Sequence, residues 1–292
     1  MHAHHARRWS WEGTLMIEYE HVSYTANGQE ILREVTLKAE PGECVLLVGP
    51  NGSGKSTLLK LGLGLLKPTS GTVRVCGGNP YSSKETRRKI GFIMDSDVLD
   101  VLLTGKENLE FFYELYNGSR PESGFINSVL ERVGLSEEAG KKAGQYSKGM
   151  RKRLEIGRLL LYHPKAVLLD EPFSGLDSGG KELLVDVVRE LKNNGAAVVM
   201  VSHETEFALG LADRVVLMVG GRTLAHFSPE EFSNAYVVSG EGTENLDGIK
   251  LGPKSVIIVS RAGVDEIVSA CREKGVALEE VMPLMKAIRR EG

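Results

Sequence analysis

The chain has 292 residues, of which 41% are hydrophobic and 26% charged, and its formal net charge is -3. That length is sufficient for one large or two modest domains with a sizeable core. The small net charge gives no overall attraction to nucleic acid or to an anionic membrane. No apolar run approaches the roughly 18 residues that span a bilayer, so we expect a membrane role only through a partner chain. The cysteines are odd in number and far apart, which favours a reducing cytoplasm over a disulfide framework: Cys44, Cys76 and Cys271.

Residues 1–8 are basic and lack the apolar segment of a secretory signal. His2, His4 and His5 raise the alternative of a metal site. A disordered tail over residues 1–15 is the better interpretation, because no cysteine or carboxylate accompanies these histidines. We expect the folded unit to begin at Met16.

Short β-like runs occupy residues 16–48, with turn signals at Asn27-Gly28 and Pro41-Gly42. This pattern predicts an antiparallel sheet that leads into a parallel core. Residues 44–48 are continuously apolar and read as a buried strand. A helical pattern begins at Ser56.

A phosphate-loop pattern, G-x-x-x-x-G-K-[ST], lies between that strand and that helix. Its glycines let the backbone approach a phosphate closely, and the helix N-terminus adds positive potential. Lys55 would reach the β- and γ-phosphates and Ser56 would bind Mg²⁺. The alternative, a glycine-rich turn, does not explain the strand, the helix and Gly-Lys-Ser together. The candidate nucleotide-binding residues are Gly49, Pro50, Asn51, Gly52, Ser53, Gly54, Lys55, Ser56 and Thr57.

The middle of the chain alternates strands and helices, which predicts a parallel sheet between helices. Residues 104–161 have mainly helical spacing, and a helical subdomain is expected over about 96–161. The buried strand at residues 166–169 ends in Asp170 and Glu171. Asp170 would hold Mg²⁺, and Glu171 would act as general base for the attacking water or orient it. His203, after the strand at residues 196–201, would donate to the γ-phosphate.

From about residue 233 the sequence pattern changes. Residues 239–245 read as a polar loop, residues 255–259 as a strand and residues 264–274 as a helix, with a second strand at 275–278. The pattern predicts a small α/β appendage over residues 233–292.

The order of these motifs resembles the ATP-binding subunits of ABC transporters over residues 16–230. The motifs that carry the resemblance are residues 49–57, residues 146–150, residues 168–172, residues 174–177 and Ser202-His203. The resemblance implies an α/β fold. It would have a P-loop NTPase core with a mostly parallel sheet, an N-terminal antiparallel β subdomain and a helical signature subdomain, all within residues 16–232.

In that family two such domains dimerise head to tail, and each ATP lies between the phosphate loop of one and the signature motif of the other. The resemblance implies that Ser147 and Gly149 contact the γ-phosphate across the interface. It also places Asp177 in the loop that couples the two sites, and makes His203 the switch histidine. Tyr24 would stack on adenine, although a core or turn tyrosine is the alternative.

Two positions depart from the family pattern. The signature reads Tyr-Ser-Lys-Gly-Met, in which Lys148 adds a charge. Similar variants occur in exporter-type subunits. Asp95 stands where the family usually has Gln; it is shorter and, when ionised, only accepts hydrogen bonds. Our hypothesis is that Asp95 keeps a Mg²⁺- or interface-sensing role; the alternative is that it only turns its loop. Asp95→Gln should then change ATPase activity or coupling.

The expected function is therefore an ATPase subunit on the cytoplasmic face of a membrane, bound there only through a separate transmembrane permease. Residues 104–145 and the loop after Asp95 would contact the permease, and the second ATP-binding domain would be another copy or a homologue. The rival is a soluble ABC-type ATPase that acts on ribosomes or DNA, but the chain has one cassette and no sustained heptads. A GTPase or kinase with only the phosphate loop would lack the signature motif. The basic cluster at residues 141–153 lacks the interleaved aromatic residues of nucleic-acid binders, and nothing in the sequence identifies the transported substrate.

Overall fold

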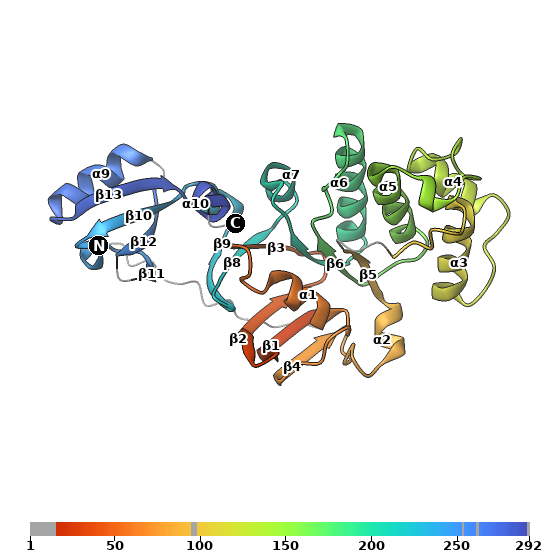
Figure 1. Cartoon of the computed structure of the whole chain (residues 1–292), viewed down its shortest axis with the longest axis horizontal. Helices are drawn as coiled ribbons and strands as arrows, with labels where there is room; N and C mark the ends of the chain where they lie inside the picture. The colour runs from red at the N-terminus through yellow and green to blue at the C-terminus, as the bar shows by residue number, and fades with distance from the viewer. Residues whose placement is uncertain (1–15, 95–97, 253, 261–262, 291–292) are drawn as a thin grey trace.

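The computed structural model describes residues 16–94, 98–252, 254–260 and 263–290 (Figure 1). The predicted tail at residues 1–15 and the candidate residue Asp95 lie outside these ranges. Over the described residues, the chain forms three β-sheets with helices around them.

The central sheet has six strands in the order β5-β6-β7-β3-β8-β9. Its first five strands run parallel, and β9 pairs antiparallel with β8. The parallel strands are almost entirely buried, which explains their unbroken apolar sequences. The predicted mostly parallel core is confirmed. The strands are β3 (Cys44–Val48), β5 (Ile90–Ile93), β6 (Ala166–Asp170), β7 (Ala197–Val201), β8 (Arg214–Val219) and β9 (Arg222–Phe227).

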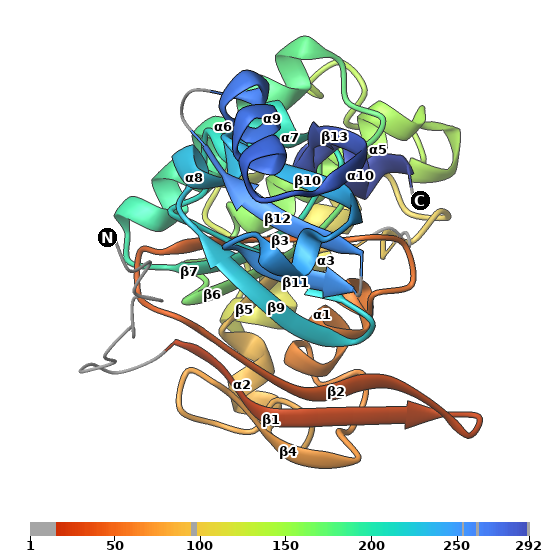
Figure 2. The ribbon, with the colours of Figure 1, turned by 90° about the vertical axis from the view of Figure 1, so that its left-hand side faces the viewer.

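The N-terminal antiparallel sheet is also confirmed, with strand order β2-β1-β4. Its strands are β1 (Ile17–Ala26), β2 (Gln29–Ala39) and β4 (Ser70–Val75). Their inward side chains share one apolar cluster with helix α1 (Lys55–Gly62) and the near face of the central sheet. In Figure 2 this sheet lies on the opposite side of the central sheet from helices α6 and α7. It therefore fixes the position of α1, whose first turn begins directly after the phosphate loop.

Helices pack around the far end and the other face of the central sheet. Those predicted within residues 104–161 pack around one apolar cluster with the central strands. Helix α3 begins with a capping box, in which Thr104 and Glu107 bond each other's backbone N–H groups. The helices before the appendage are α2 (Lys84–Arg88), α3 (Gly105–Asn117), α4 (Phe125–Arg132), α5 (Lys148–Leu159), α6 (Ser178–Asn193), α7 (Thr205–Leu209) and α8 (Pro229–Ser233).

The C-terminal unit is a small antiparallel sheet in the order β11-β12-β10-β13, with two helices. Its own core is small and separate from the other two clusters. The polar loop predicted at residues 239–245 is wrong in its first half. Strand β10 continues to Glu241 because it pairs with β12 on one side and β13 on the other. The elements are β10 (Ala235–Glu241), β11 (Ile249–Gly252), β12 (Ser255–Val259), α9 (Val264–Glu273), β13 (Ala277–Pro283) and α10 (Leu284–Arg290).

Among the described residues, every helix is too short or too polar to cross a bilayer.

Candidate functional site

The phosphate loop connects β3 to α1. Gly49 has φ 151°, and a Cβ added there would lie 2.0 Å from the carbonyl oxygen of Met218 on β8. Only glycine fits where the loop leaves the sheet so close to its neighbour. Gly52 has φ 76° and would have no heavy atom within 4 Å of an added Cβ. The loop is therefore pressed against the sheet at its start and open at its tip.

Lys55 begins α1 and holds the loop closed. Its Nζ donates to the carbonyl oxygens of Gly49 and Pro50, both at 2.8 Å, and approaches the Ser53 hydroxyl at 3.4 Å. Burial lowers the pKa of Lys55, and the nearby charges of Glu171 and Asp170 oppose that shift. The ammonium is thus positioned inside the loop, where it can exchange neutral carbonyl acceptors for a phosphate.

Strand β6 ends in the two carboxylates that the sequence singled out. Asp170 is its last residue and is 4% exposed. Glu171 follows with φ 47°, a left-handed conformation that costs a non-glycine residue energy. Its backbone N–H donates to the Val201 carbonyl at 2.9 Å, which fixes the turn against β7.

Glu171 and His203 join the ends of β6 and β7. The backbone N–H of His203 donates to Oε2 of Glu171 at 3.0 Å, and its Nε2 lies 3.5 Å from Oε1. Burial raises the pKa of the Glu171 carboxyl, while the His203 N–H and the His203 charge lower it less. Glu171 is therefore a more basic carboxylate than a solvated one.

One open cleft of about 630 Å³ brings most of the predicted residues together. This volume is typical of a small-molecule site. Part of the phosphate loop, both carboxylates and His203 line it. Two further segments that sequence reasoning missed also line it: the start of β2 and the glycine turn between β8 and β9. The lining comprises Gln29, Glu30, Ile31, Arg33, Asn51, Gly52, Gly54, Lys55, Ser56, Thr57, Asp170, Glu171, Val201, His203, Gly220 and Gly221.

The turn at Gly220-Gly221 carried a readable signal, since adjacent glycines after a buried strand are typical of a hairpin. Nothing in the sequence, however, predicts that this turn lies beside the cleft. The backbone N–H of Arg33 donates to the Gly221 carbonyl at 2.8 Å, which joins β2 to this turn. A long-range backbone contact thus sets the wall of the cleft.

Among the described residues, seven predicted ones do not line this cleft: Gly49, Pro50 and Ser53 of the phosphate loop, and Tyr24, Ser147, Gly149 and Asp177. Tyr24 lies on β1 opposite Leu32 and packs partly buried against the N-terminal sheet's core. Ser147 caps α5, where its hydroxyl accepts the Met150 N–H at 3.1 Å, and Gly149 is in the first turn of that helix. Asp177 caps α6.

Asp177 accepts the Gly180 N–H at 2.9 Å and pairs with Arg153 of α5 at 2.6 Å. The Arg153 guanidinium holds the pKa of Asp177 below its usual range. Lys148, the unusual residue of the signature, is exposed and donates to the Ser174 hydroxyl at 3.1 Å. The signature helix and the loop before α6 are therefore connected at two points.

Comparison with known proteins identifies the fold and its family. Residues 32–174 match the family described as ABC transporter. The Nod factor export ATP-binding protein I of Rhizobium etli is 32% identical over 218 residues, which cover 74% of this chain and 69% of that protein. An uncharacterized ABC transporter ATP-binding protein of Bacillus subtilis, YxlF, is 35% identical over 239 residues, covering 80% of this chain and 79% of that protein. The chain belongs to the ATP-binding subunits of ABC transporters.

Solved structures agree with this identification. An ATP-binding subunit of an ABC transporter matches with TM-score 0.69 and 29% identity, over 74% of this chain and 91% of that one. A dimeric ATP-binding cassette bound to ADP and Pi matches with TM-score 0.65 and 29% identity, over 73% of this chain and 99% of that one. The chain is thus an ATP-binding and ATP-hydrolysing subunit, and such subunits work with a transmembrane permease.

Proposed function

We propose that this chain hydrolyses ATP at a site shared between two ATP-binding domains and thereby drives a separate permease that exports its substrate. The observation that carries the proposal is the single cleft in which the phosphate loop, Asp170, Glu171 and His203 meet. The residue roles below are those that the cleft and the family resemblance support.

Lys55 and the loop N–H groups would bind the phosphates of ATP. Ser56 and Asp170 both line the cleft and offer the hydroxyl and carboxylate oxygens that Mg²⁺ prefers. Among the described residues no group of three or more His, Cys, Asp and Glu could hold a metal. That fits an ion held by two side chains, phosphates and water rather than by a protein cage. When bound, Mg²⁺ would neutralise charge on the β- and γ-phosphates.

Glu171 would take a proton from the attacking water. The water oxygen forms a bond to the γ-phosphorus while the bond from phosphorus to the ADP oxygen breaks, so the products are ADP and phosphate. The raised pKa of the Glu171 carboxyl is closer to neutral pH than that of a solvated carboxyl, which suits a general base. His203, oriented through its N–H to Glu171, would donate to the γ-phosphate.

The signature residues would complete the site of a second domain. Ser147 and Gly149 begin the 12-residue helix α5, where free backbone N–H groups and the helix dipole favour a phosphate. Asp177 would lie at the same interface and Tyr24 would stack on adenine. The second domain would be another copy of this chain or a homologue. Asp95 keeps its predicted sensing role, to be tested by Asp95→Gln.

The permease contact would lie on the helical part of the chain. Large apolar side chains are exposed before and along α3, at Val101, Leu102, Phe111 and Leu115, with Leu102 71% exposed. Exposed apolar residues that gather in one region mark interaction surfaces. Export is the direction supported by the exporter-type signature and by the Nod factor export relatives. The chain would then be cytoplasmic and peripheral on the membrane.

Affinity purification from its native cell tests this proposal. The tagged chain should co-purify with a multi-spanning membrane protein, and Leu102→Asp with Phe111→Asp should lose that partner while keeping ATP affinity. Leu65→Asp is the matched control, since Leu65 is 63% exposed and lies outside the helical part. Recovery of ribosomes or DNA in place of a membrane protein would favour the soluble ATPase.

A further inference from the structure

Helix α10 of the C-terminal unit packs between strands β10 and β13 of its own sheet and helix α8 of the ATPase core. Leu284, its first residue, is 1% exposed and lies in the large apolar cluster that includes the central strands and Phe232 of α8. Met285 and Ile288 pack against the same cluster. The C-terminal unit's own core, built around Val256 and Ile267, is a separate cluster.

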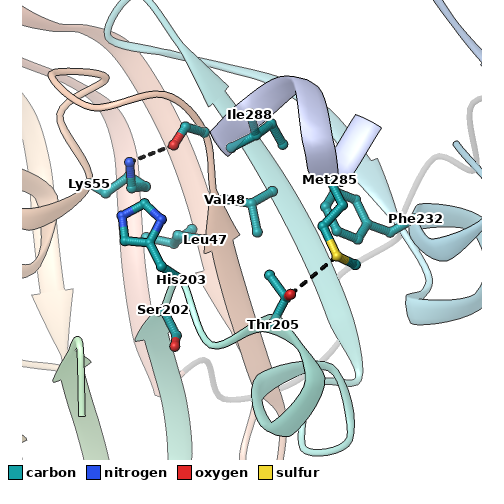
Figure 3. A pocket seen from close by; sticks show the side chains of 10 residues that line it. Leu47, Val48, Lys55, Ser202, His203, Thr205, Phe232, Met285 and Ile288 are labelled. Carbon is teal, nitrogen blue, oxygen red and sulfur yellow. Dashed lines mark hydrogen bonds between the residues drawn. The ribbon is translucent and has the colours of Figure 1, made fainter. Parts of the chain in front are cut away.

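The helix reaches the segment that carries the switch histidine. The hydroxyl of Thr205, the first residue of α7, donates to Sδ of Met285 at 3.2 Å. In Figure 3, Met285 and Ile288 line one side of a small pocket, His203 and Lys55 lie next to each other on the opposite side, and Thr205 lies next to Met285. One helix turn of the C-terminal unit therefore contacts the switch segment at Thr205 and lines one pocket together with Gly49 and Lys55 of the phosphate loop.

The switch segment needs such support because it is short. Helix α7 has five residues and begins two residues after His203. The bonds that join the segment to its surroundings include the His203 N–H to Glu171 and the Glu204 N–H to the Ser202 hydroxyl, both at 3.0 Å, and an ion pair of Glu204 with Lys181 of α6 at 3.1 Å. The orientation of so short a surface turn also depends on what packs behind it.

The connection to the rest of the unit is direct. Strand β13 ends at Pro283 and α10 begins at Leu284. A shift of the C-terminal sheet relative to the ATPase core would therefore be transmitted to α10 without an intervening loop.

We propose that Met285 and Ile288 are positioning residues for ATP hydrolysis. They hold the Ser202–Thr205 segment so that His203 stays aligned with Glu171 and the phosphate loop, and they couple the C-terminal unit to the catalytic site. The inference rests on the role of His203 in the proposed function.

The test compares Met285→Ala/Ile288→Ala with Ile267→Ala in the purified full chain. Ile267 is 2% exposed in the C-terminal unit's own core, so its truncation removes a buried apolar side chain from the same unit away from α10. Hydrogen exchange of the amides at residues 202–205 is measured without nucleotide. The double variant should lose about tenfold of the protection there, because a local opening then needs less free energy, and the control should keep its protection.

Single-turnover ATP hydrolysis gives the second measurement. The double variant should lower the rate at saturating ATP about tenfold, since even a ~1 Å misplacement can cost up to about 10²-fold, with the ATP Kd unchanged. In a His203→Ala background the same substitutions should add less than about twofold, because residues that act through one group are not additive.

The outcomes separate the two proposals. If exchange at residues 202–205 is unchanged, or Ile267→Ala has the same effect, α10 does not position the switch segment. Full additivity with His203→Ala also overturns the inference. If His203→Ala itself hydrolyses ATP at the wild-type rate, the proposed function is wrong about His203, whatever the exchange data show.

Discussion

Glu171→Gln is the substitution for which the structure makes opposite predictions for activity and stability. Gln has nearly the same shape, and its carbonyl oxygen can still accept the His203 N–H that Glu171 accepts at 3.0 Å. The amide cannot take a proton from water. We expect kcat to fall about 10²–10⁴-fold, the usual worth of a general base, or roughly 2.7–5.5 kcal/mol in activation free energy.

The same substitution should leave the thermal stability of the chain unchanged or raise it. Burial raises the pKa of Glu171 above 4.5, so the folded state binds this proton more tightly than the unfolded state. The stability from this group is fully present below pH 4.5 and is lost as the pH rises through the folded pKa. At pH 7.5 the wild-type chain therefore carries an ionised, partly buried carboxylate that Gln lacks. The Tm of Glu171→Gln at pH 7.5 should equal or exceed that of wild type.

Phosphate release, ATP binding and thermal unfolding at pH 7.5 and pH 4 test this reasoning. The control is Glu206→Gln, an exposed carboxylate on α7 outside the cleft, which should leave rate and Tm unchanged. The wild-type kcat should rise with pH as Glu171 loses its proton. A variant rate within about threefold of wild type would rule out the general base, and a lower Tm at pH 7.5 would show that the carboxylate is structural.

Three other substitutions probe the phosphate loop and the helical part of the chain. Gly49→Ala places a Cβ 2.0 Å from the Met218 carbonyl oxygen, so the loop must shift at a cost of about 1–3 kcal/mol. Calorimetry should therefore show a lower Tm and weaker ATP binding. Wild-type values for both would contradict the close contact. Lys55→Met removes charge-assisted hydrogen bonds worth about 1.5–3 kcal/mol. ATP titration should therefore show a Kd raised about 10–150-fold. An unchanged Kd would mean that Lys55 keeps its bonds to the loop carbonyls when ATP binds. Arg158→Met removes a buried guanidinium that donates to the Phe92 carbonyl and stacks 4.1 Å from the Phe92 ring centroid. Urea unfolding should show the free energy of unfolding lowered by about 2–4 kcal/mol, because a buried acceptor loses its donor and a cation–π contact is lost. A decrease under about 0.5 kcal/mol, as for a surface substitution, would contradict this expectation.

The parts of the site that could be predicted from the sequence are those whose chemistry needs neighbouring residues in a fixed order. The phosphate loop requires glycines, Lys55 and Ser56 within nine residues, between a strand and a helix. Asp170 and Glu171 follow directly from a buried strand. Such local patterns constrain the backbone strongly enough to be read without tertiary contacts.

The parts that the sequence did not predict depend on contacts between distant segments. Strand β10 contains Ser239 and Gly240, which favour a loop locally, but pairing on both sides holds it extended. The cleft wall at Arg33 and Gly221 arises from one backbone bond between β2 and a hairpin. Helix α10 has only seven residues, too few for a clear helical period, and its burial depends on contacts with β10, β13 and α8.

The topology also bears on why one chain would need a partner. Helix α5 carries the signature at its first turn and packs against α3, α4, α6 and β5, at the end of the central sheet away from β3. Strands β6 and β7 separate β5 from β3, whose end carries the phosphate loop. Ser147 and Gly149 are therefore absent from the cleft lined by Lys55, although their helix N-terminus suits a phosphate. A second domain that brings its own signature to this cleft would supply the groups that this chain presents elsewhere, so hydrolysis would depend on association.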